Sequence, residues 1–224
     1  MLMMQEVFNE KSGVIIDQAK LSDIPMIAAL FTVSFKESVL HHCGGRLPAT
    51  RAMQDVFTLV YQAEPHAAFL AKNTQGQSLG YCFAPTKLSG LWLRALWGGH
   101  LLKWTWRWLT GQYGFGLHPI KVIAMNKLAF LHSAMAPAKT ANARILSIAV
   151  APEARGRGIA NQLMGAAMDY FATQKVTRVR LEVRPGNVAA SRVYEKWGFI
   201  EDGYTMDSQG KWLIMFREME QHHV

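Results

Sequence analysis

The chain has 224 residues, of which 50% are hydrophobic and 18% are charged, and its formal net charge is +8. This length and composition suffice for one domain with a full core and exclude an intrinsically disordered chain. The two cysteines, Cys43 and Cys82, have no CxxC spacing, so they indicate neither a disulfide framework nor a structural zinc site. We therefore expect no metal.

Positive charge is concentrated in the middle of the chain. Between Glu64 and Glu153 there is no Asp or Glu but nine Lys and Arg residues, which exceeds the net charge of +8. This basic stretch is compatible with a phosphate-bearing ligand, an acidic membrane surface or nucleic acid. The first ten residues contain acidic side chains and no long apolar run, so we expect no secretory signal and a cytoplasmic location.

The part of the chain before Pro85 predicts a strand, two helices and a hairpin. Capping residues and helical spacing place the first helix, and Gly76 supplies the hairpin turn. The expected elements are a strand at Val14–Gln18, a helix that begins near Leu21–Pro25 and ends at His41–Gly45, a helix over Leu47–Gln62, and strands at Ala67–Lys72 and Ser78–Phe83.

A tryptophan-rich insertion is predicted over about residues 85–142, with a second helix near 119–133. Five of the seven tryptophans lie in it, yet no run approaches the ~18 apolar residues of a membrane span. Helical spacing gives it one stripe of Trp97, Leu101, Trp104 and Trp108 and another of His100, Lys103 and Arg107. Three roles fit: a wall of an acceptor pocket, peripheral membrane contact through Trp97, Trp104 and Trp108, or a homodimer contact. Nucleic acid is disfavoured.

The remainder predicts alternating strands and helices, and the whole order indicates a mixed α/β fold without repeats. The expected elements are a strand at Ile145–Val150, a turn, a helix to Gln174, a strand at Val179–Val183, a helix over Ala189–Lys196, a strand after Gly198, and a hairpin through Ser208–Gly210 into Trp212–Met219.

The turn after Val150 has the features of an anion site. The consecutive amides of Gly156, Arg157 and Gly158 can point into one concavity, and the following helix adds its unpaired N–H groups and positive dipole end. Arginine is unfavourable at a helix N-terminus without an anion, so Arg155 and Arg157 favour a bound pyrophosphate.

Two motifs in this order, with a strand between them, resemble the GNAT superfamily of acyl-CoA-dependent N-acyltransferases. They are Arg155-x-x-Gly158-x-Ala160 and Asn187-x-x-Ala190-x-x-x-Tyr194-x-x-x-Gly198-Phe199. The resemblance implies an α/β (α+β) fold, in which helices flank a mixed central sheet and a helical insertion precedes the central strand. It also implies a single domain over residues 1–224.

The resemblance assigns cofactor roles by position. Backbone groups of Ile148 and Val150 would pair with the pantetheine arm, Asn187 would hold that arm, and Tyr194 would protonate the departing thiolate. The pyrophosphate would be wrapped by Arg155, Gly156, Arg157, Gly158, Ile159 and Ala160. The implied co-substrate is acetyl-CoA or another acyl-CoA.

The general base is less well defined. The resemblance implies a Glu or Asp on or beside the central strand, as in many GNAT members, but Arg144–Val150 contains neither. Glu182, on the next strand, is the candidate, although Arg180 or Arg184 is equally suited to pair with it. The rivals are Glu37, His41, His42 and His132. We interpret His41-His42-Cys43 as a helix end, because adjacent helical residues point apart.

The predicted function is transfer of an acyl group, most simply acetyl, to a primary amine of a small metabolite, amino sugar or peptide. The amine would attack the thioester directly in a ternary complex. The alternative is a non-catalytic CoA-binding or membrane-docking module with the same fold, located at the inner face of a membrane.

Overall fold

The computed structural model describes residues 7–9, 13–87, 94–95, 97–114, 141 and 143–219. Its elements in chain order are β1 (Val7–Asn9), β2 (Val14–Gln18), η1 (Leu21–Asp23), α1 (Ile24–Ser34), α2 (Lys36–His42), α3 (Thr50–Ala63), η2 (Pro65–Ala67), β3 (Ala68–Asn73), β4 (Ser78–Phe83), α5 (His100–Leu109), β5 (Ala143–Arg144), β6 (Ser147–Val150), η3 (Pro152–Ala154), α7 (Ile159–Thr173), β7 (Arg178–Val183), α8 (Val188–Lys196), β8 (Ile200–Asp207) and β9 (Gly210–Glu218).

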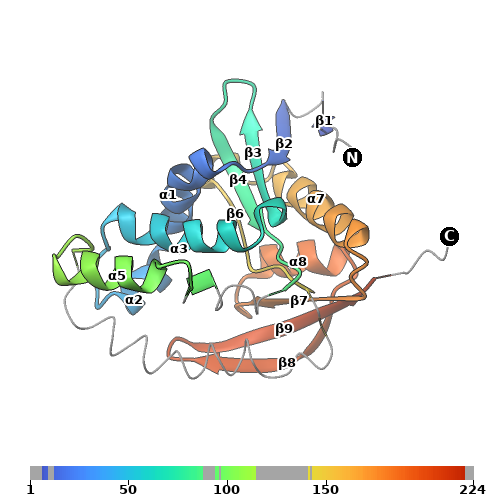
Figure 1. Cartoon of the computed structure of the whole chain (residues 1–224). Helices are drawn as coiled ribbons and strands as arrows, with labels where there is room; N and C mark the ends of the chain where they lie inside the picture. The colour runs from blue at the N-terminus through green and yellow to red at the C-terminus, as the bar shows by residue number, and fades with distance from the viewer. Residues whose placement is uncertain are drawn as a thin grey trace.

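The first sheet is antiparallel, with strand order β1-β2-β3-β4-β6, and has helices on both faces (Figure 1). Side chains alternate across a strand. Leu70, Tyr81 and Phe83 therefore pack with α1 and α3. Phe69 and Cys82 point to the other face, which α7 covers. The central strands are buried on both faces, as their apolar sequences predict.

The second sheet has the order β5-β7-β9-β8, in which β5 and β7 are parallel and the other pairs are antiparallel. Val179, Leu181 and Val183 of β7 belong to the same buried cluster as α7 and Tyr194 of α8. The predicted mixed α/β class, with sheets flanked by helices, is confirmed.

The continuous strand predicted at Ile145–Val150 is wrong at its start. The structure has β6 only from Ser147, after a β-bulge that separates it from β5. Leu146 donates its N–H to the Phe83 carbonyl at 2.9 Å, while Ser147 is the ladder partner of the same Phe83. Two residues opposite one define a bulge, which changes the direction of the backbone groups that follow. Pairing with β7 ends here, at the 2.9 Å bond from Ile145 N–H to the Arg180 carbonyl.

The single helix predicted from Leu21 to His41 is two helices, α1 and α2, bent by 89°. The bend lies at Phe35, whose ring packs on Phe31 with centroids 4.9 Å apart. No single helix within the described ranges is long and apolar enough to cross a membrane; only this bent pair, taken together, reaches that length and composition.

Helix α5 lies in the predicted insertion and begins after Gly99, which has φ +70°. The helix predicted near 119–133 lies outside the described residues. The two predicted stripes of α5 are not its inner and outer faces: His100 is buried, and Trp104 and Trp108 are half-buried. The outer face consists of Leu102, Trp106 and Leu109.

Candidate active site

The edge of β6 that faces away from β4 presents backbone groups of Ile148 and Val150. Ala151 donates its N–H to the Leu79 carbonyl of the β4 side at 2.8 Å, so alternation turns Ile148 and Val150 the other way. β6 is the last strand of its sheet within the described residues. The Val150 carbonyl accepts from Arg155 Nε at 3.4 Å, in agreement with this direction.

The turn after β6 is open to solvent. Residues 155–158 are exposed, and Gly156 and Gly158 have φ near +75°, a conformation that favours glycine. An added Cβ at either glycine meets nothing within 4 Å, so the concavity has room for a ligand. Gly158 caps α7, and the first amides of that helix have no intrahelical acceptor. Ile159 is buried and Ala160 half-buried, so they anchor the turn to the core.

A second glycine brings this turn close to the sheet. A Cβ on Gly80 of β4 would lie 2.8 Å from the Ala149 carbonyl oxygen and 3.1 Å from Leu163 Cδ1 of α7. Real Cβ atoms do not approach backbone so closely, so only glycine fits between the strands and α7. The N-terminal turns of α7 are thereby seated against β4 and β6.

Tyr194 of α8 is 7% exposed and packs edge-on against Phe199, with ring centroids 6.2 Å apart. Burial, and to a smaller extent the neighbouring Cys82 of β4, raises the pKa of the Tyr194 phenol well above its ordinary value. Among the described residues its hydroxyl has no hydrogen-bond partner. The hydroxyl is not one of the fully buried polar atoms that lack a partner, so it reaches accessible space although the ring is buried. This group is therefore available to a ligand and stays protonated at neutral pH.

Asn187 has a structural role in the absence of a ligand. Its side-chain oxygen accepts from the Ala190 N–H at 3.2 Å and so caps α8. Asn187 is predicted to hold the cofactor arm, and the cap uses only the oxygen of its amide. The two amide hydrogens remain donors.

Glu182 lies on β7 just beyond the point where β6 and β7 diverge. Its Oε1 accepts from Arg180 Nη2 at 2.5 Å and from Arg144 Nη1 at 3.3 Å. Both arginines are buried, and burial lowers the pKa of the Arg144 guanidinium. Of the two partners predicted for Glu182, Arg180 pairs with it, whereas Arg184 pairs with Asp207. Arg144 was missed, because only the pairing of β5 with β7 brings it near.

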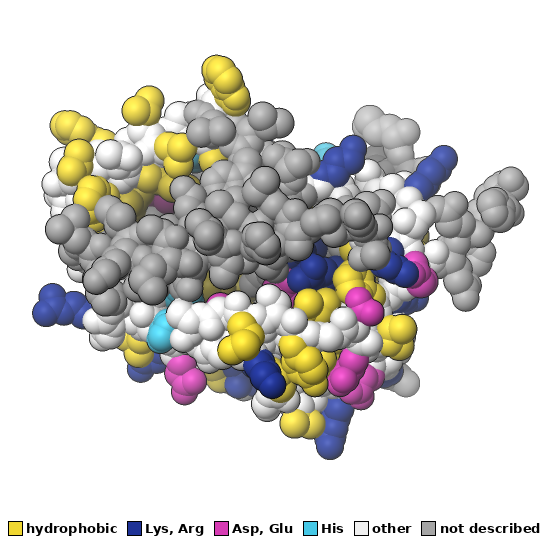
Figure 2. All heavy atoms as spheres, turned by 90° about the horizontal axis from the view of Figure 1, so that it is seen from below, with side chains coloured by type: hydrophobic (Ala, Val, Ile, Leu, Met, Phe, Trp, Pro, Cys, Tyr) yellow, Lys and Arg dark blue, Asp and Glu magenta, His cyan; other side chains and the backbone are white. Residues whose placement is uncertain are grey.

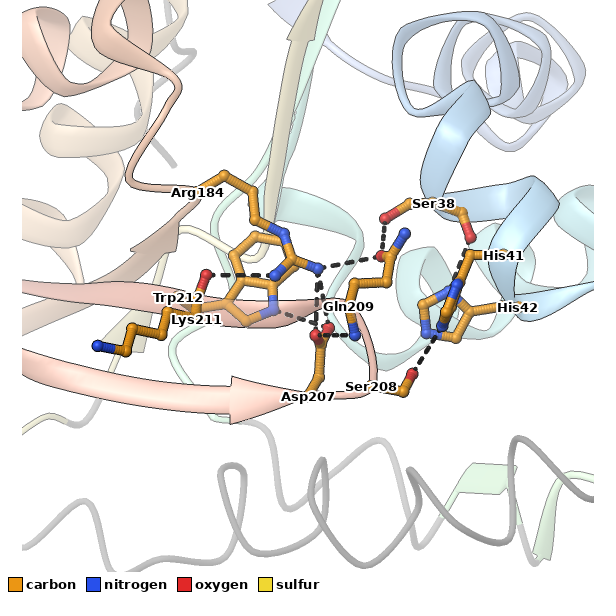
Figure 3. Close-up of polar contacts among 9 residues, drawn as sticks. All are labelled: Ser38, His41, His42, Arg184, Asp207, Ser208, Gln209, Lys211 and Trp212. Carbon is orange, nitrogen blue, oxygen red and sulfur yellow. Dashed lines mark hydrogen bonds and ion pairs between the residues drawn. The ribbon is translucent and has the colours of Figure 1, made fainter.

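Arg184 instead joins a polar cluster between α2 and the β8–β9 hairpin (Figure 3). It donates to both carboxylate oxygens of Asp207 at 3.1 and 3.2 Å and stacks on Trp212, with its Cζ 3.8 Å from the ring centroid. Ser38 and His41 of α2 contact Gln209 and Ser208 of the hairpin. The sequence gives no signal for this contact, which spans more than 160 positions of the chain.

The rival bases are engaged or exposed elsewhere. His41 contacts Ser208, His42 Nδ1 contacts the Ser38 carbonyl, and Glu37 is exposed on α2. His132 lies outside the described residues. α2 ends at His42, in agreement with the interpretation of this triplet as a helix end. No group of three His, Cys, Asp or Glu in the described part of the chain is placed to hold a metal ion.

One polar group near the turn was not predicted. Asn161, in the first turn of α7, has a buried Oδ1 without a hydrogen-bond partner among the described residues. The oxygen and nitrogen of such an amide are interchangeable by a flip, so it can present a donor at this place.

Comparisons with known proteins identify the family of this chain. The model of the acetyltransferase (GNAT) family matches residues 92–199. The chain is 30% identical over 102 residues to the [ribosomal protein bS18]-alanine N-acetyltransferase of Salmonella typhimurium, a match that covers 46% of this chain and 68% of the relative. The chain belongs to the GNAT family of acetyltransferases. The turn at Arg155–Ala160, Glu182, Asn187 and Tyr194 all lie inside the matched residues.

Other GNAT proteins match over smaller parts or at lower identity. Over 74 residues the chain is 36% identical to a mycothiol acetyltransferase of Tsukamurella paurometabola, which covers 33% of this chain and 25% of that relative. A phosphinothricin acetyltransferase of Sinorhizobium meliloti, solved in complex with AcCoA, shares the fold with a TM-score of 0.57 and 13% identity, over 94% of this chain and 91% of that one. This chain thus spans about a quarter of one curated relative and about two thirds of the other.

Proposed function

We propose that this GNAT protein transfers an acetyl group from acetyl-CoA to the primary amine of a small molecule or peptide. The observation that carries the proposal is the hydroxyl of Tyr194, a residue that is 7% exposed: this hydroxyl has no hydrogen-bond partner among the described residues, and burial of the ring raises its pKa so that it stays protonated. A neutral phenol inside the fold is suited to donate a proton to a leaving thiolate.

The remaining features fit one extended co-substrate. The outward N–H and C=O groups of Ile148 and Val150 match the amides of a pantetheine arm, and the open turn at Arg155–Ala160 matches a pyrophosphate. Asn187 follows the next strand and has amide donors to offer. The AcCoA bound in the related phosphinothricin acetyltransferase supports this choice of co-substrate.

The transfer would proceed in one complex. The neutral amine attacks the thioester carbonyl carbon, and the carbonyl oxygen gains negative charge, which a backbone N–H near Ile148 would stabilise. The carbon–sulfur bond then breaks, and the thiolate takes the Tyr194 proton. The amine nitrogen loses a proton to Glu182, directly or through water, and the phenol is reprotonated from solvent.

Glu182 remains the proposed base, and its arginine pairs define how it is tested. In Glu182→Gln the acceptor geometry toward Arg144 and Arg180 is retained while proton uptake is removed. We expect kcat to fall by about a hundredfold, the lower end for a general base. The melting temperature should change less than in Glu182→Ala, which removes the acceptor of both guanidinium groups. An unchanged kcat in Glu182→Gln would assign Glu182 to positioning only.

Thermal shift tests the co-substrate. Acetyl-CoA at 100 times its Kd should stabilise the protein by about 2.7 kcal/mol, and desulfo-CoA should do nearly as well, because the pyrophosphate and arm are shared. A screen of amines, scored by release of free thiol, then identifies the acceptor. Stabilisation without thiol release from any amine would favour the alternative, a non-catalytic CoA-binding module. No stabilisation at all would contradict both.

A further inference from the structure

Helix α5 exposes large apolar side chains on its outer face. Three large side chains at i, i+4 and i+7 spacing are exposed: Leu102 by 80%, Trp106 by 67% and Leu109 by 68%. We call these three residues the α5 apolar face. Soluble proteins rarely expose such a contiguous group, and it marks an interaction surface when they do. Hydrophobic side chains gather on the side of the molecule where α5 lies (Figures 1 and 2).

The basic side of α5 faces the protein and fixes the helix. Arg107 Nη1 lies 2.5 Å and Lys103 Nζ 3.3 Å from the carboxylate of Asp55 on α3, which is 5% exposed. Tyr113 donates to the same carboxylate at 2.7 Å, and His100 contacts Gln62 at 3.0 Å. These contacts set the rotation of the helix, so the outward direction of its apolar face follows from specific bonds.

The charge around this face selects the partner. Among the described residues beside α5, Arg94 is exposed and Lys103 has a side chain that is 46% exposed, so positive charge is accessible next to the α5 apolar face. Two copies meeting through this face would bring two basic regions together, which is unfavourable. An anionic bilayer attracts the same region, and tryptophan is favoured at the depth of lipid headgroups.

We propose that the α5 apolar face docks this protein on the surface of an anionic lipid bilayer. The helix would lie in the interfacial plane, with Leu102, Trp106 and Leu109 among the acyl-chain boundaries and α3 on the solvent side. The membrane contact predicted through Trp104 and Trp108 is moved in this proposal to the α5 apolar face, because Trp104 and Trp108 are half-buried. Trp97, which is 86% exposed just before the helix, is a further contact.

Vesicle flotation with the full chain tests the proposal. Vesicles of phosphatidylcholine with about 30% phosphatidylglycerol should bind the protein at about 0.1 M salt, and phosphatidylcholine alone should bind it much less. In the triple variant Leu102→Ser, Trp106→Ser and Leu109→Ser, binding should fall by about tenfold or more. The matched control is Val33→Ser with Met206→Ser, two side chains exposed by 60% and 63% on other elements, which should bind like wild type.

Two further measurements separate the alternatives. Melting temperature and CoA binding should be unchanged in the triple variant, since its side chains are exposed, so lost flotation reports the surface and not the fold. Light scattering after gel filtration gives the oligomeric state. A wild-type dimer that becomes monomeric in the triple variant, without vesicle binding by either, would overturn the proposal in favour of a second copy. Equal vesicle binding by wild type and triple variant would also overturn it.

Discussion

At the β6 edge, the backbone N–H and C=O groups of Ile148 and Val150 point sideways, away from β4, and the surrounding side chains are apolar. On α5 the arrangement differs: Arg107 and Lys103 pair with the buried carboxylate of Asp55, while Leu102 and Trp106 are exposed. The backbone N–H and C=O groups at the β6 edge lack the neighbouring strand that would ordinarily pair with them. The apolar side chains on the outer side of α5 lack the hydrophobic core that would ordinarily cover them. One region therefore fits a small polar ligand, and the other fits an apolar surface.

The two regions also differ in what keeps them open. The β6 edge depends on a backbone feature, the bulge at Leu146–Ser147, and α5 depends on a single buried carboxylate, Asp55. Changes at the β6 edge should therefore affect the acyl transfer more than the stability of the fold. Changes at Asp55 or α5 should affect stability more than the acyl transfer.

The largest effect is expected for Tyr194→Phe. The ring and its contact with Phe199 are kept, so the fold and acyl-CoA affinity should be nearly unchanged. The thiolate loses its proton donor, and kcat should fall by about 10²- to 10⁴-fold. Steady-state kinetics beside thermal shift with acetyl-CoA checks both parts. Wild-type turnover would remove the acid role of Tyr194.

Asp55→Asn should act on stability instead. Lys103 and Arg107 would lose their carboxylate; because both cations are partly exposed, we expect the cost of a hydrogen bond to a charged group, about 1.5 to 3 kcal/mol of unfolding free energy. Urea denaturation measures this, and kcat should stay within about twofold of wild type. The matched control, Asp169→Asn on exposed α7 surface, should be neutral.

The pH dependence of the same contact has a defined sign. Burial alone raises the pKa of Asp55, but bonds from Arg107 and Tyr113 and the charge of Lys103 outweigh it and hold the pKa below its ordinary value. The stabilisation is therefore complete above about pH 4 and is lost as pH falls further. Wild type and Asp55→Asn should converge in stability at acid pH; a constant difference would contradict the pairing.

The residues proposed for the β6 site could be selected from the sequence because their signals are local. A phosphate-binding turn needs glycines and a helix start within a few residues, and Tyr194 follows from the spacing of one short helix. The bulge was not predictable, because it depends on how Leu146 and Ser147 meet Phe83 of another strand. The pairing of Arg144 with Glu182 was missed for the same reason.

The helical period of α5 was predictable, but its inner face was not. Trp104, His100 and Arg107 lie on neighbouring stripes, and hydrophobicity alone would bury Leu102 and Trp106 in preference to two basic residues. The deciding group is Asp55, about fifty positions earlier in the chain on α3. A distant carboxylate can reverse the orientation that periodicity favours.

A smaller effect is expected at Asn187. Asn187→Ala removes the α8 cap and should cost about 1 kcal/mol, whereas Asn187→Asp keeps a capping oxygen and should cost little. If the amide donors also hold the cofactor arm, both variants should raise KM for acetyl-CoA by about threefold to tenfold. We expect that rise in both. A wild-type KM in Asn187→Asp would leave the cap as the role of this residue.

The smallest effect is expected in the pH dependence of kcat, because Tyr194 should not ionise between neutral pH and about pH 10. Burial raises the pKa of this phenol, and the reaction uses its protonated form, so kcat should show no alkaline decline from Tyr194 up to about pH 10. Rising pH also deprotonates the acceptor amine, which increases the rate until a plateau. A pH profile of kcat at saturating amine and acetyl-CoA measures this. A decline near pH 8 to 9 would mean that the proton donor is a more acidic group than Tyr194.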